Sequence, residues 1–400
     1  MWRGHNGQRL PSRDLTADKM KQKSHLIARW NHDGPKRILT IDGGGVRGMI
    51  AIQFLREIEN QVCDSEDCQV LADYFDLIGG TSTGSIIASL LALGNSADEI
   101  DQIYRSFTKA VFKKRWLGSL MGGNFSARFS KSAFRDLCKE LIGDLTLGSE
   151  KIRTGLMIVT RRTDTGSPWV IHNNPASKYF AGKADDSFVP NSEYRLAEII
   201  LASCSAPTFF VPQRIEIGRT SNGQSYEGVF IDGGCTPYNN PSLLAYRLVT
   251  VKGFGYCWPT GVENLEMVSV GTGGITNKFS QPRFKPAALF GIQALRGLLD
   301  DCARDVEIMM QLLSDSPTSR TIDSEIGDLK GEYISEKPMF RYLRYNVDLE
   351  SRALTDLLGI KVDDVEAKNL KSIERVELVS RYAEIGRNAA IKYVSPAHFK

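Results

Sequence analysis

The sequence predicts an α/β fold with a mainly parallel central sheet and a helical C-terminal extension. Apolar segments at 37–41, 75–78 and 228–232 each end in a glycine-rich turn, as expected of buried strands that enter loops at a sheet edge. The first two turns lead into helical patterns at 49–58 and 86–93, and strands that alternate with helices are typical of parallel sheets. A length of 400 residues, with 42% apolar and 24% charged residues, suits one large globular domain with additions.

Periodicity and turn residues predict the remaining elements. We expect helices at 97–113, 131–142, 195–204, 286–313 and 376–393, and strands at 154–160, 169–172, 266–270 and 339–347. The first two of these strands should pair as a hairpin, because a turn-rich stretch separates them. We therefore expect three parts: a basic arm (1–36), an α/β domain (37–275) and a mostly helical C-terminal region (276–400) that packs on the α/β domain or completes it.

Charge is nearly balanced overall but concentrated near the start of the chain. The formal net charge of +3 points to no particular partner, and we expect no nucleic-acid partner for the protein as a whole. Residues 1–37 alone carry a net charge of +6. This arm is either a solvated leader or a contact for anionic lipid or nucleic acid.

Several features indicate a cytoplasmic protein. Residues 1–23 are polar and do not resemble a secretion signal, and the longest apolar run, 86–93, is far shorter than the ~20 residues of a membrane-spanning helix. The seven cysteines are scattered, as in proteins of a reducing compartment. Only Cys63 and Cys68 are close in sequence, and no histidine accompanies them, so we expect no metal site.

A candidate nucleophile stands in the turn after the second predicted strand. Gly80-Thr81-Ser82-Thr83-Gly84 fits the G-x-S-x-G elbow, in which a sharp strand-to-helix turn exposes the serine. The flanking glycines leave room for a substrate carbonyl to approach. Taken alone, the pentapeptide could equally be a turn that caps a buried helix, so its meaning depends on the other motifs.

A glycine-rich loop, Asp42-Gly43-Gly44-Gly45-Val46-Arg47-Gly48, follows the first predicted strand. Successive N–H groups of such a loop can face one concavity, where the positive end of the next helix helps to hold negative charge. The candidates for an oxyanion hole are therefore Gly43, Gly44, Gly45, Arg47 and Gly48. Arg47 could also meet a lipid phosphate or anchor a nearby carboxylate. The loop fits the dinucleotide fingerprint as well, but residues 61–69 are polar where that motif expects a second strand.

A candidate base ends the strand at 228–232, in the sequence Asp232-Gly233-Gly234. Acyl transfer needs a nucleophile, a base that takes its proton and donors for the oxyanion. Ser82, Asp232 and the glycine loop provide one of each, and a single parallel sheet would bring the three turns to one edge. The alternative is that Asp232 only caps a turn.

Together these motifs resemble those of the patatin-like phospholipase family. D-G-G-G-V-R-G, G-T-S-T-G and D-G-G stand in the family's order, and three shorter matches support them: A-S-C-S-A-P at 202–207, N-N-P at 239–241 and S-V-G-T-G at 269–273. The resemblance covers about residues 37–274 and implies a three-layer α/β/α fold. It also implies hydrolysis of membrane glycerophospholipids by a Ser-Asp dyad, with Ser82 as nucleophile, Asp232 as base and the glycine loop around the oxyanion. Because an exposed aspartate has a pKa of about 3.9, Asp232 would need burial or a short hydrogen bond to Ser82.

The resemblance also bears on regulation. Bacterial members of the family include antiviral effectors that stay inactive until a cyclic di- or oligonucleotide binds, and then degrade the cell's own membrane. Such an activator, with no other cofactor, and action at the inner face of the membrane are therefore expected. Residues 275–400 offer material for a nucleotide sensor or for a homo-oligomer contact.

Two other functions remain open. An α/β-hydrolase triad would need a histidine after Asp232, and only His398 follows it. A protein that kept the fold and lost the chemistry would be a nucleotide-sensing binding protein. The helix at 286–313 could line an acyl groove, lie on a bilayer or pack in the core.

Overall fold

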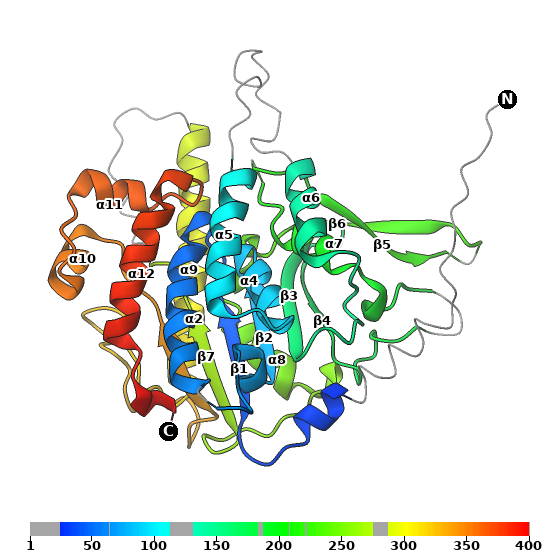
Figure 1. Cartoon of the computed structure of the whole chain (residues 1–400), viewed down its shortest axis with the longest axis horizontal. Helices are drawn as coiled ribbons and strands as arrows, with labels where there is room; N and C mark the ends of the chain where they lie inside the picture. Colours follow the sequence, from blue (N-terminus) through cyan, green and yellow to red (C-terminus); the bar gives the residue numbers. More distant parts are fainter. Residues whose placement is uncertain are drawn as a thin grey trace.

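A mixed β-sheet runs through the middle of the molecule, with helices on both of its faces (Figure 1). The computed structural model describes residues 25–63, 65–112, 131–182, 187–207, 209–220, 222–274 and 287–399. Within these residues the sheet has eight strands, namely β1 (Lys36–Ile41), β2 (Leu77–Thr81), β3 (Gly155–Arg162), β4 (Ser167–His172), β5 (Gln213–Arg219), β6 (Ser225–Asp232), β7 (Leu265–Val270) and β8 (Arg341–Tyr345). The first 24 residues of the predicted basic arm, and residues 275–286, lie outside the described residues.

Most strands of the sheet are parallel. The order is β5-β6-β3-β2-β1-β7-β8, and β4 also pairs with β3. The strands β3, β2, β1, β7 and β8 run in one direction, whereas β4, β5 and β6 are antiparallel to the strands beside them. The predicted α/β fold with a mainly parallel sheet is thus confirmed, and the expected hairpin at 154–172 is the pair β3 and β4.

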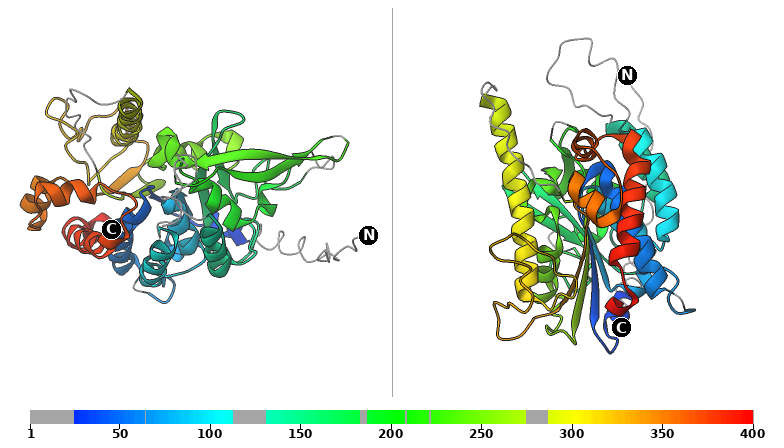
Figure 2. Two further views of the ribbon diagram at one scale, coloured as in Figure 1. Left: turned by 90° about the horizontal axis from the view of Figure 1, so that it is seen from above. Right: turned by 90° about the vertical axis from the view of Figure 1, so that its left-hand side faces the viewer.

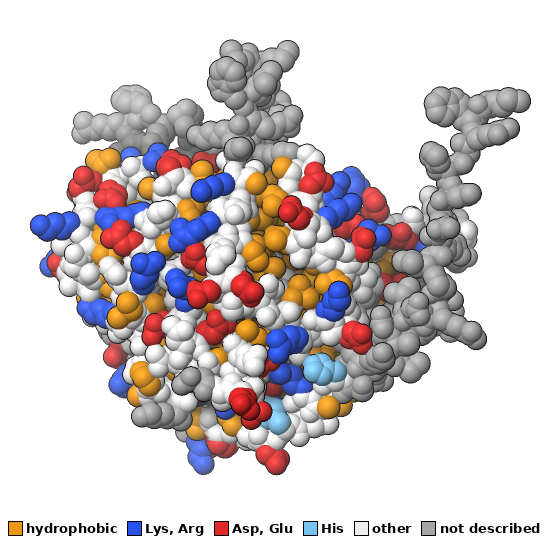
Figure 3. Space-filling view, viewed as in Figure 1, with side chains coloured by type: hydrophobic (Ala, Val, Ile, Leu, Met, Phe, Trp, Pro, Cys, Tyr) orange, Lys and Arg blue, Asp and Glu red, His pale blue; other side chains and the backbone are white. Residues whose placement is uncertain are grey.

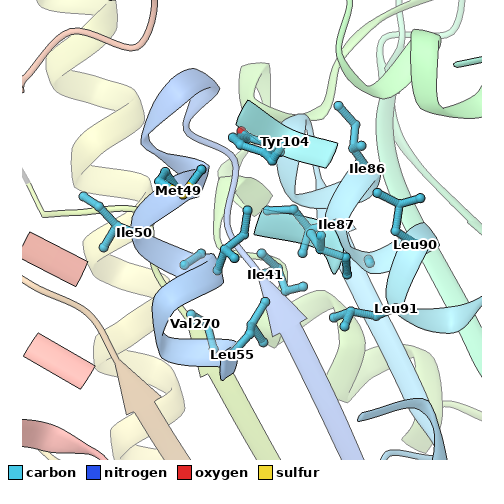
Figure 4. Close-up of a cluster of buried hydrophobic side chains, with 14 of the residues drawn as sticks. Ile41, Met49, Ile50, Leu55, Ile86, Ile87, Leu90, Leu91, Tyr104 and Val270 are labelled. Atoms are coloured by element: carbon cyan, nitrogen blue, oxygen red, sulfur yellow. The ribbon is translucent and has the colours of Figure 1, made fainter. Parts of the chain in front are cut away.

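Alternate residues of the central strands face two separate hydrophobic cores. On β1, Leu39 and Ile41 belong to one buried cluster, and Ile38 belongs to the other. Side chains alternate across a strand, so a strand with helices on both faces is apolar along most of its length. Figure 4 shows the first cluster, in which residues of α2 and α4 pack over Ile41 of β1 and Val270 of β7.

The helices divide between these two cores. The first core receives residues from α2 (Gly48–Val62), α3 (Leu71–Tyr74), α4 (Thr83–Ala92), α5 (Ala97–Val111), α6 (Lys131–Ile142), α7 (Leu196–Ser203), α10 (Ser351–Leu358), α11 (Asp364–Leu370) and α12 (Val379–Tyr393). The second core receives residues from α8 (Ser242–Thr250) and α9 (Ala287–Leu313). The right-hand view of Figure 2 shows α9 on one side of the sheet and α12 on the other, which is the three-layer arrangement.

The helices α2 and α4 begin next to each other, and neither has a side-chain cap. The N-cap side chain makes no hydrogen bond to the first turn of α2, which follows the glycine loop, or of α4, which follows Ser82, and the same holds for α7, α8, α10 and α12. By contrast, Ser96 and Glu99 cap α5 reciprocally. The first N–H groups of an uncapped helix need other partners and make that end of the helix positive.

The visible face of the molecule shows no large region of a single charge (Figure 3). Figure 3 shows acidic and basic side chains interspersed over one face, with hydrophobic side chains gathered between α5 and α6. The left-hand view of Figure 2 shows β5 and β6 reaching beyond the rest of the sheet. Among the described residues, no helix is both long enough and apolar enough to span a bilayer.

Five helices and strands were not expected from the sequence: α3, β5, α8, α10 and α11. β5 is an edge strand with four of its seven residues buried, and the four helices are at most nine residues long, so their apolar patterns are short. The expected strand at 339–347 is β8, which pairs with β7. The C-terminal region therefore supplies the last strand of the sheet.

Candidate active site

Ser82 lies at a sharp turn between β2 and α4. Its backbone has φ +52° and ψ −129°, in a region that residues with a Cβ rarely adopt. The neighbouring glycines make this turn sterically feasible. A Cβ on Gly80 would lie 2.2 Å from the carbonyl oxygen of Gly84, and a Cβ on Gly84 would lie 2.4 Å from that of Ile41.

Hydroxyl groups hold the main chain of this turn. The N–H of Ser82 donates to Oγ of Ser203 at 2.9 Å, and its carbonyl accepts from Oγ of Ser85 at 2.6 Å. Thr81 donates through Oγ1 to the carbonyl of Tyr238 at 2.7 Å. The side chain of Ser82 is therefore presented by a main chain with few unsatisfied groups.

Asp232 meets Ser82 although 150 positions separate them in sequence. Ser82 Oγ donates to Oδ2 of Asp232 at 2.6 Å. The other carboxylate oxygen, Oδ1, accepts the N–H of Gly234 at 2.7 Å. Gly233 is tightly enclosed in the same turn, because a Cβ there would lie 2.4 Å from the Val159 carbonyl oxygen. One carboxylate thus both contacts the serine and caps its own turn, the two alternatives considered from the sequence.

The route by which Asp232 reaches Ser82 differs from our prediction. We expected parallel strands to bring the turns together, but β6 is antiparallel to β3. Asp232 pairs with Thr160 of β3, next to Val159, which pairs with Thr81 of β2. β3 extends past the serine turn, and β6 runs antiparallel alongside this extension. The end of β6, where Asp232 stands, therefore lies next to the serine turn.

Burial changes the acidity of Asp232. The residue is only 4% exposed, and desolvation raises its pKa to about 6, although the hydrogen bonds from Ser82 and Gly234 act in the opposite direction. A carboxylate with this pKa is still mostly ionised at neutral pH and is a stronger base than an exposed aspartate. The condition stated for Asp232 from the sequence is thus met by its surroundings.

Side chains donate hydrogen bonds to two carbonyl groups of the glycine loop. The Gly43 carbonyl accepts from Thr272 Oγ1 at 2.8 Å and from Asn239 Nδ2 at 3.3 Å, and the Gly45 carbonyl accepts from the Tyr104 hydroxyl at 2.5 Å. In a trans peptide the N–H points away from the carbonyl oxygen. The N–H of Gly44 is accordingly turned away from Thr272, and it makes a long contact of 3.3 Å with Thr83 Oγ1 of the serine turn.

Not every N–H of this loop is available to a substrate. The N–H of Gly43 donates to the Asn239 carbonyl at 3.2 Å, that of Arg47 to the Gly44 carbonyl at 3.2 Å, and that of Gly48 to carbonyls within its own turn. The N–H of Gly45 has no acceptor in the part of the chain that the structure describes. Across the described ranges, the N–H of Gly44 donates only to the side-chain hydroxyl of Thr83, at 3.3 Å, and not to a main-chain carbonyl. Among the five predicted residues, Gly44 and Gly45 are therefore the better candidates for oxyanion donors. Gly43 contributes close approach, since a Cβ there would lie 3.0 Å from Ser82 Cβ.

The Arg47 side chain is buried near the carboxylates of Asp42 and Asp300. Its residue is 8% exposed, and Nε and Nη1 have no hydrogen-bond partner within the described ranges. Burial lowers its pKa, while the neighbouring Tyr382, Asp300 and Asp42 act to raise it.

The two histidines considered from the sequence, His398 and His172, contact residues other than Ser82 and Asp232. His398 Nδ1 hydrogen-bonds to the Tyr345 hydroxyl at 2.9 Å. His172 is buried on β4 beside Phe254 and Tyr256, and burial lowers its pKa to about 4. Within the described residues no histidine contacts Ser82 or Asp232, and no three His, Cys, Asp or Glu side chains gather as a metal site would require.

Comparison with known proteins decides the family. Residues 39–246 match the patatin-like phospholipase family. This chain belongs to that family. The cUMP-AMP-activated phospholipase of Escherichia coli is 31% identical to this patatin-like phospholipase over 309 residues, which are 75% of this chain and 85% of the relative.

Two further relatives show the breadth of the patatin-like phospholipases. Patatin-like protein 2 of Oryza sativa subsp. indica is 27% identical over 85% of this chain and 82% of its own length. The cGAMP-activated phospholipase of Escherichia coli (strain TW11681) is 33% identical over 53% of this chain and 55% of its own length. As a patatin-like phospholipase, the protein is a serine acyl hydrolase that acts on lipids.

The dinucleotide interpretation of the glycine loop fails, because β2 ends in Thr81 and not in the acidic residue that such a site needs.

Sequence reasoning missed the residues that support this patatin-like site. Ser203, Asn239 and Thr272 stand in the three shorter matches, so the resemblance marked their segments without indicating a role. Tyr104 lies within the helix predicted at 97–113 and in none of the motifs. No local signal identified its contact with Gly45, because that contact depends on where α5 crosses the glycine loop.

The helix predicted at 286–313 is α9, which begins at Ala287. Its second half packs in the core through Val306 and Met310, which is one of the three placements expected from the sequence. Leu298 is 58% exposed.

Proposed function

We propose that this patatin-like phospholipase cleaves acyl esters of membrane glycerophospholipids with Ser82 as nucleophile and Asp232 as general base. The hydrogen bond of 2.6 Å between Ser82 Oγ and the Asp232 carboxylate is the observation that carries this proposal. It links the hydroxyl directly to a base, so that no histidine is needed between them.

The first half of the reaction transfers the acyl group to the enzyme. Ser82 Oγ attacks the carbonyl carbon of the ester while its proton passes to Asp232. The carbonyl oxygen becomes an oxyanion, for which the N–H groups of Gly44 and Gly45 are the proposed donors. When the ester bond breaks, Asp232 returns the proton to the leaving alcohol, which departs as a lysophospholipid.

The second half restores the enzyme. A water molecule attacks the acyl-Ser82 ester while Asp232 takes one of its protons. The second oxyanion forms at the same donors, and its collapse breaks the bond to Ser82 Oγ, which recovers the proton from Asp232. A fatty acid leaves, and both side chains return to their starting states.

We propose further that a cyclic di- or oligonucleotide activates the enzyme. Two relatives with about 30% identity are named for activation by cUMP-AMP and by cGAMP, which supports a nucleotide switch here. A switch of this kind would confine membrane hydrolysis at the inner face to the time of an infection signal, as an antiviral effector requires.

Liposome hydrolysis tests these proposals together. Phosphatidylglycerol and phosphatidylethanolamine vesicles are incubated with the wild type, Ser82→Ala, Asp232→Asn and His398→Ala, with and without a panel of cyclic dinucleotides, and fatty acid and lysophospholipid are measured by mass spectrometry. We expect products from the wild type and His398→Ala only, with EDTA having no effect, and more product when one nucleotide of the panel is present.

The outcomes separate the parts of the proposal. Product from Ser82→Ala would remove the nucleophile assignment, and an inactive but folded His398→Ala would favour the triad. Equal product with and without every nucleotide would remove activation by that panel and leave the dyad standing.

A further inference from the structure

Arg344 of β8 reaches across the sheet to the start of the glycine loop. Its Nη1 donates to Asp42 Oδ1 at 2.9 Å and its Nη2 to Asp42 Oδ2 at 2.6 Å, so the pair is bidentate. Nη1 also donates to Ser269 Oγ of β7 at 2.8 Å. Asp42 is the residue between β1 and Gly43, and the contact spans 302 positions of sequence.

The Arg344–Asp42 pair is buried, and Glu307 lies next to Arg344. The side chains of Arg344 and Asp42 are 5% and 9% exposed. Glu307 of α9 lies 4.0 Å from Arg344 Nε and is itself held by Arg320. Removing two charges from water is costly unless the geometry satisfies both, so a bidentate pair here fixes one arrangement of Asp42 and disfavours others.

Asp42 joins the two loops of the active site. Its N–H donates to the Val270 carbonyl at 3.0 Å, and its carbonyl oxygen would lie 2.6 Å from a Cβ on Gly84 of the serine turn. A shift of Asp42 would therefore move the glycine loop relative to Ser82. The C-terminal region holds this loop at a second point, since the Val46 N–H donates to the Ile373 carbonyl at 3.0 Å.

We propose that Arg344 is a positioning residue for the acyl transfer, which it serves by holding Asp42 so that the N–H groups of Gly44 and Gly45 face the oxyanion. This inference rests on the proposed function of Ser82 and the glycine loop. It assigns the C-terminal region a part in the chemistry, although no residue of that region within 287–399 hydrogen-bonds to Ser82 or Asp232.

Steady-state kinetics of Arg344→Gln, Arg344→Lys, Arg341→Gln and Ser82→Ala on a p-nitrophenyl acyl ester test the proposal, under the condition where the wild type is most active. Arg341 is the matched control, because it lies on the same strand and pairs with Glu266 at 2.8 Å without touching the glycine loop. Thermal unfolding of each variant reports how much protein is folded at the assay temperature.

We expect kcat of Arg344→Gln to fall about 10- to 100-fold, with KM within about 2-fold of the wild type. Deleting one oxyanion donor lowers kcat by about 10²–10³-fold, and a displaced donor should lower the same rate constant by less. Arg344→Lys keeps the charge but only one contact point, so its kcat should lie between those of the wild type and Arg344→Gln. Arg341→Gln should lower the thermal midpoint and leave kcat unchanged.

Three results would overturn the proposal. One is a folded Arg344→Gln with wild-type kcat, another is wild-type kcat in Arg344→Lys when the glutamine variant does not fold, and the third is an equal loss of kcat in Arg341→Gln. If the wild type does not exceed Ser82→Ala, the proposed function fails first, and this outcome is distinct from a failure of Arg344 alone.

Discussion

The hydroxyl of Ser203 forms a bridge between the nucleophile turn and the central sheet. It accepts the N–H of Ser82 at 2.9 Å and donates to the carbonyl of Val159 on β3 at 2.6 Å. The backbone of Ser82 has positive φ, a conformation that costs about 1–3 kcal/mol and persists only where its surroundings hold it. Ser203 is part of those surroundings, and α7 brings it to the turn.

Replacing Ser203 with alanine should therefore destabilise the protein and slow the reaction. The substitution removes the hydroxyl that pairs with both of these backbone groups, and a buried polar group left without a partner costs about 1–3 kcal/mol. Urea denaturation and kcat check this expectation. Ser89→Ala is the matched control, because Ser89 is also buried in a helix and donates only to the carbonyl one turn earlier. Equal effects of the two substitutions would contradict a special role of Ser203.

Gly44 should not tolerate a side chain. A Cβ there would lie 2.2 Å from Thr272 Oγ1, so either the glycine loop moves or Thr272 leaves the Gly43 carbonyl. We expect kcat of Gly44→Ala to fall ~10-fold or more, since misplaced donors no longer match the oxyanion. Gly253→Ala, where a Cβ would meet no atom within 4 Å, should keep wild-type kcat. Wild-type kcat in Gly44→Ala would show that the loop geometry is not critical.

The pH–rate profile should report the acidity of Asp232. Its pKa is raised to about 6, and only the ionised carboxylate can take the proton of Ser82. We therefore expect kcat/KM to be constant above pH 7 and to fall tenfold per pH unit below about pH 6. A profile that stays level down to pH 4 would mean that Asp232 is not the base.

The same pKa shift predicts a stability gain in Asp232→Asn. A folded-state pKa above the ordinary value of 3.8 means that the folded protein binds this proton more tightly, so its stabilising effect is full below pH 4 and is lost as pH rises through 6. At pH 8 the asparagine variant avoids the cost of the buried charge, up to ~3 kcal/mol. Thermal midpoints of both proteins at pH 4.5 and pH 8 check this, and a difference that does not grow with pH would contradict it.

Local patterns sufficed for the parallel part of the fold. The strands β1, β2 and β7 are short apolar runs that end in glycine turns, and helices such as α5 show a clear apolar face. The direction of β6 could not be predicted, because an apolar run looks the same in both directions. Its placement depends on the hairpin with β5, an edge strand whose alternating pattern includes arginine and glutamate.

The chemistry-bearing residues were easier to find than the residues that hold them. Ser82, Asp232 and the glycines stand in short motifs, because their backbone conformations demand particular residue types. Tyr104 and Arg344 carry no such signal, since a tyrosine in a helix and an arginine in a strand are compatible with many folds. Their contacts with Gly45 and Asp42 arise only when α5 and β8 pack beside the glycine loop.

The most direct test of the account is to locate the adduct of a fluorophosphonate probe by peptide mass spectrometry. A probe of this type reacts with a serine whose hydroxyl is activated by a neighbouring base. The account predicts one adduct, on Ser82, that is strongly reduced in Asp232→Asn and unchanged in His398→Ala. An adduct on another residue, or full labelling of Ser82 in Asp232→Asn, would contradict it.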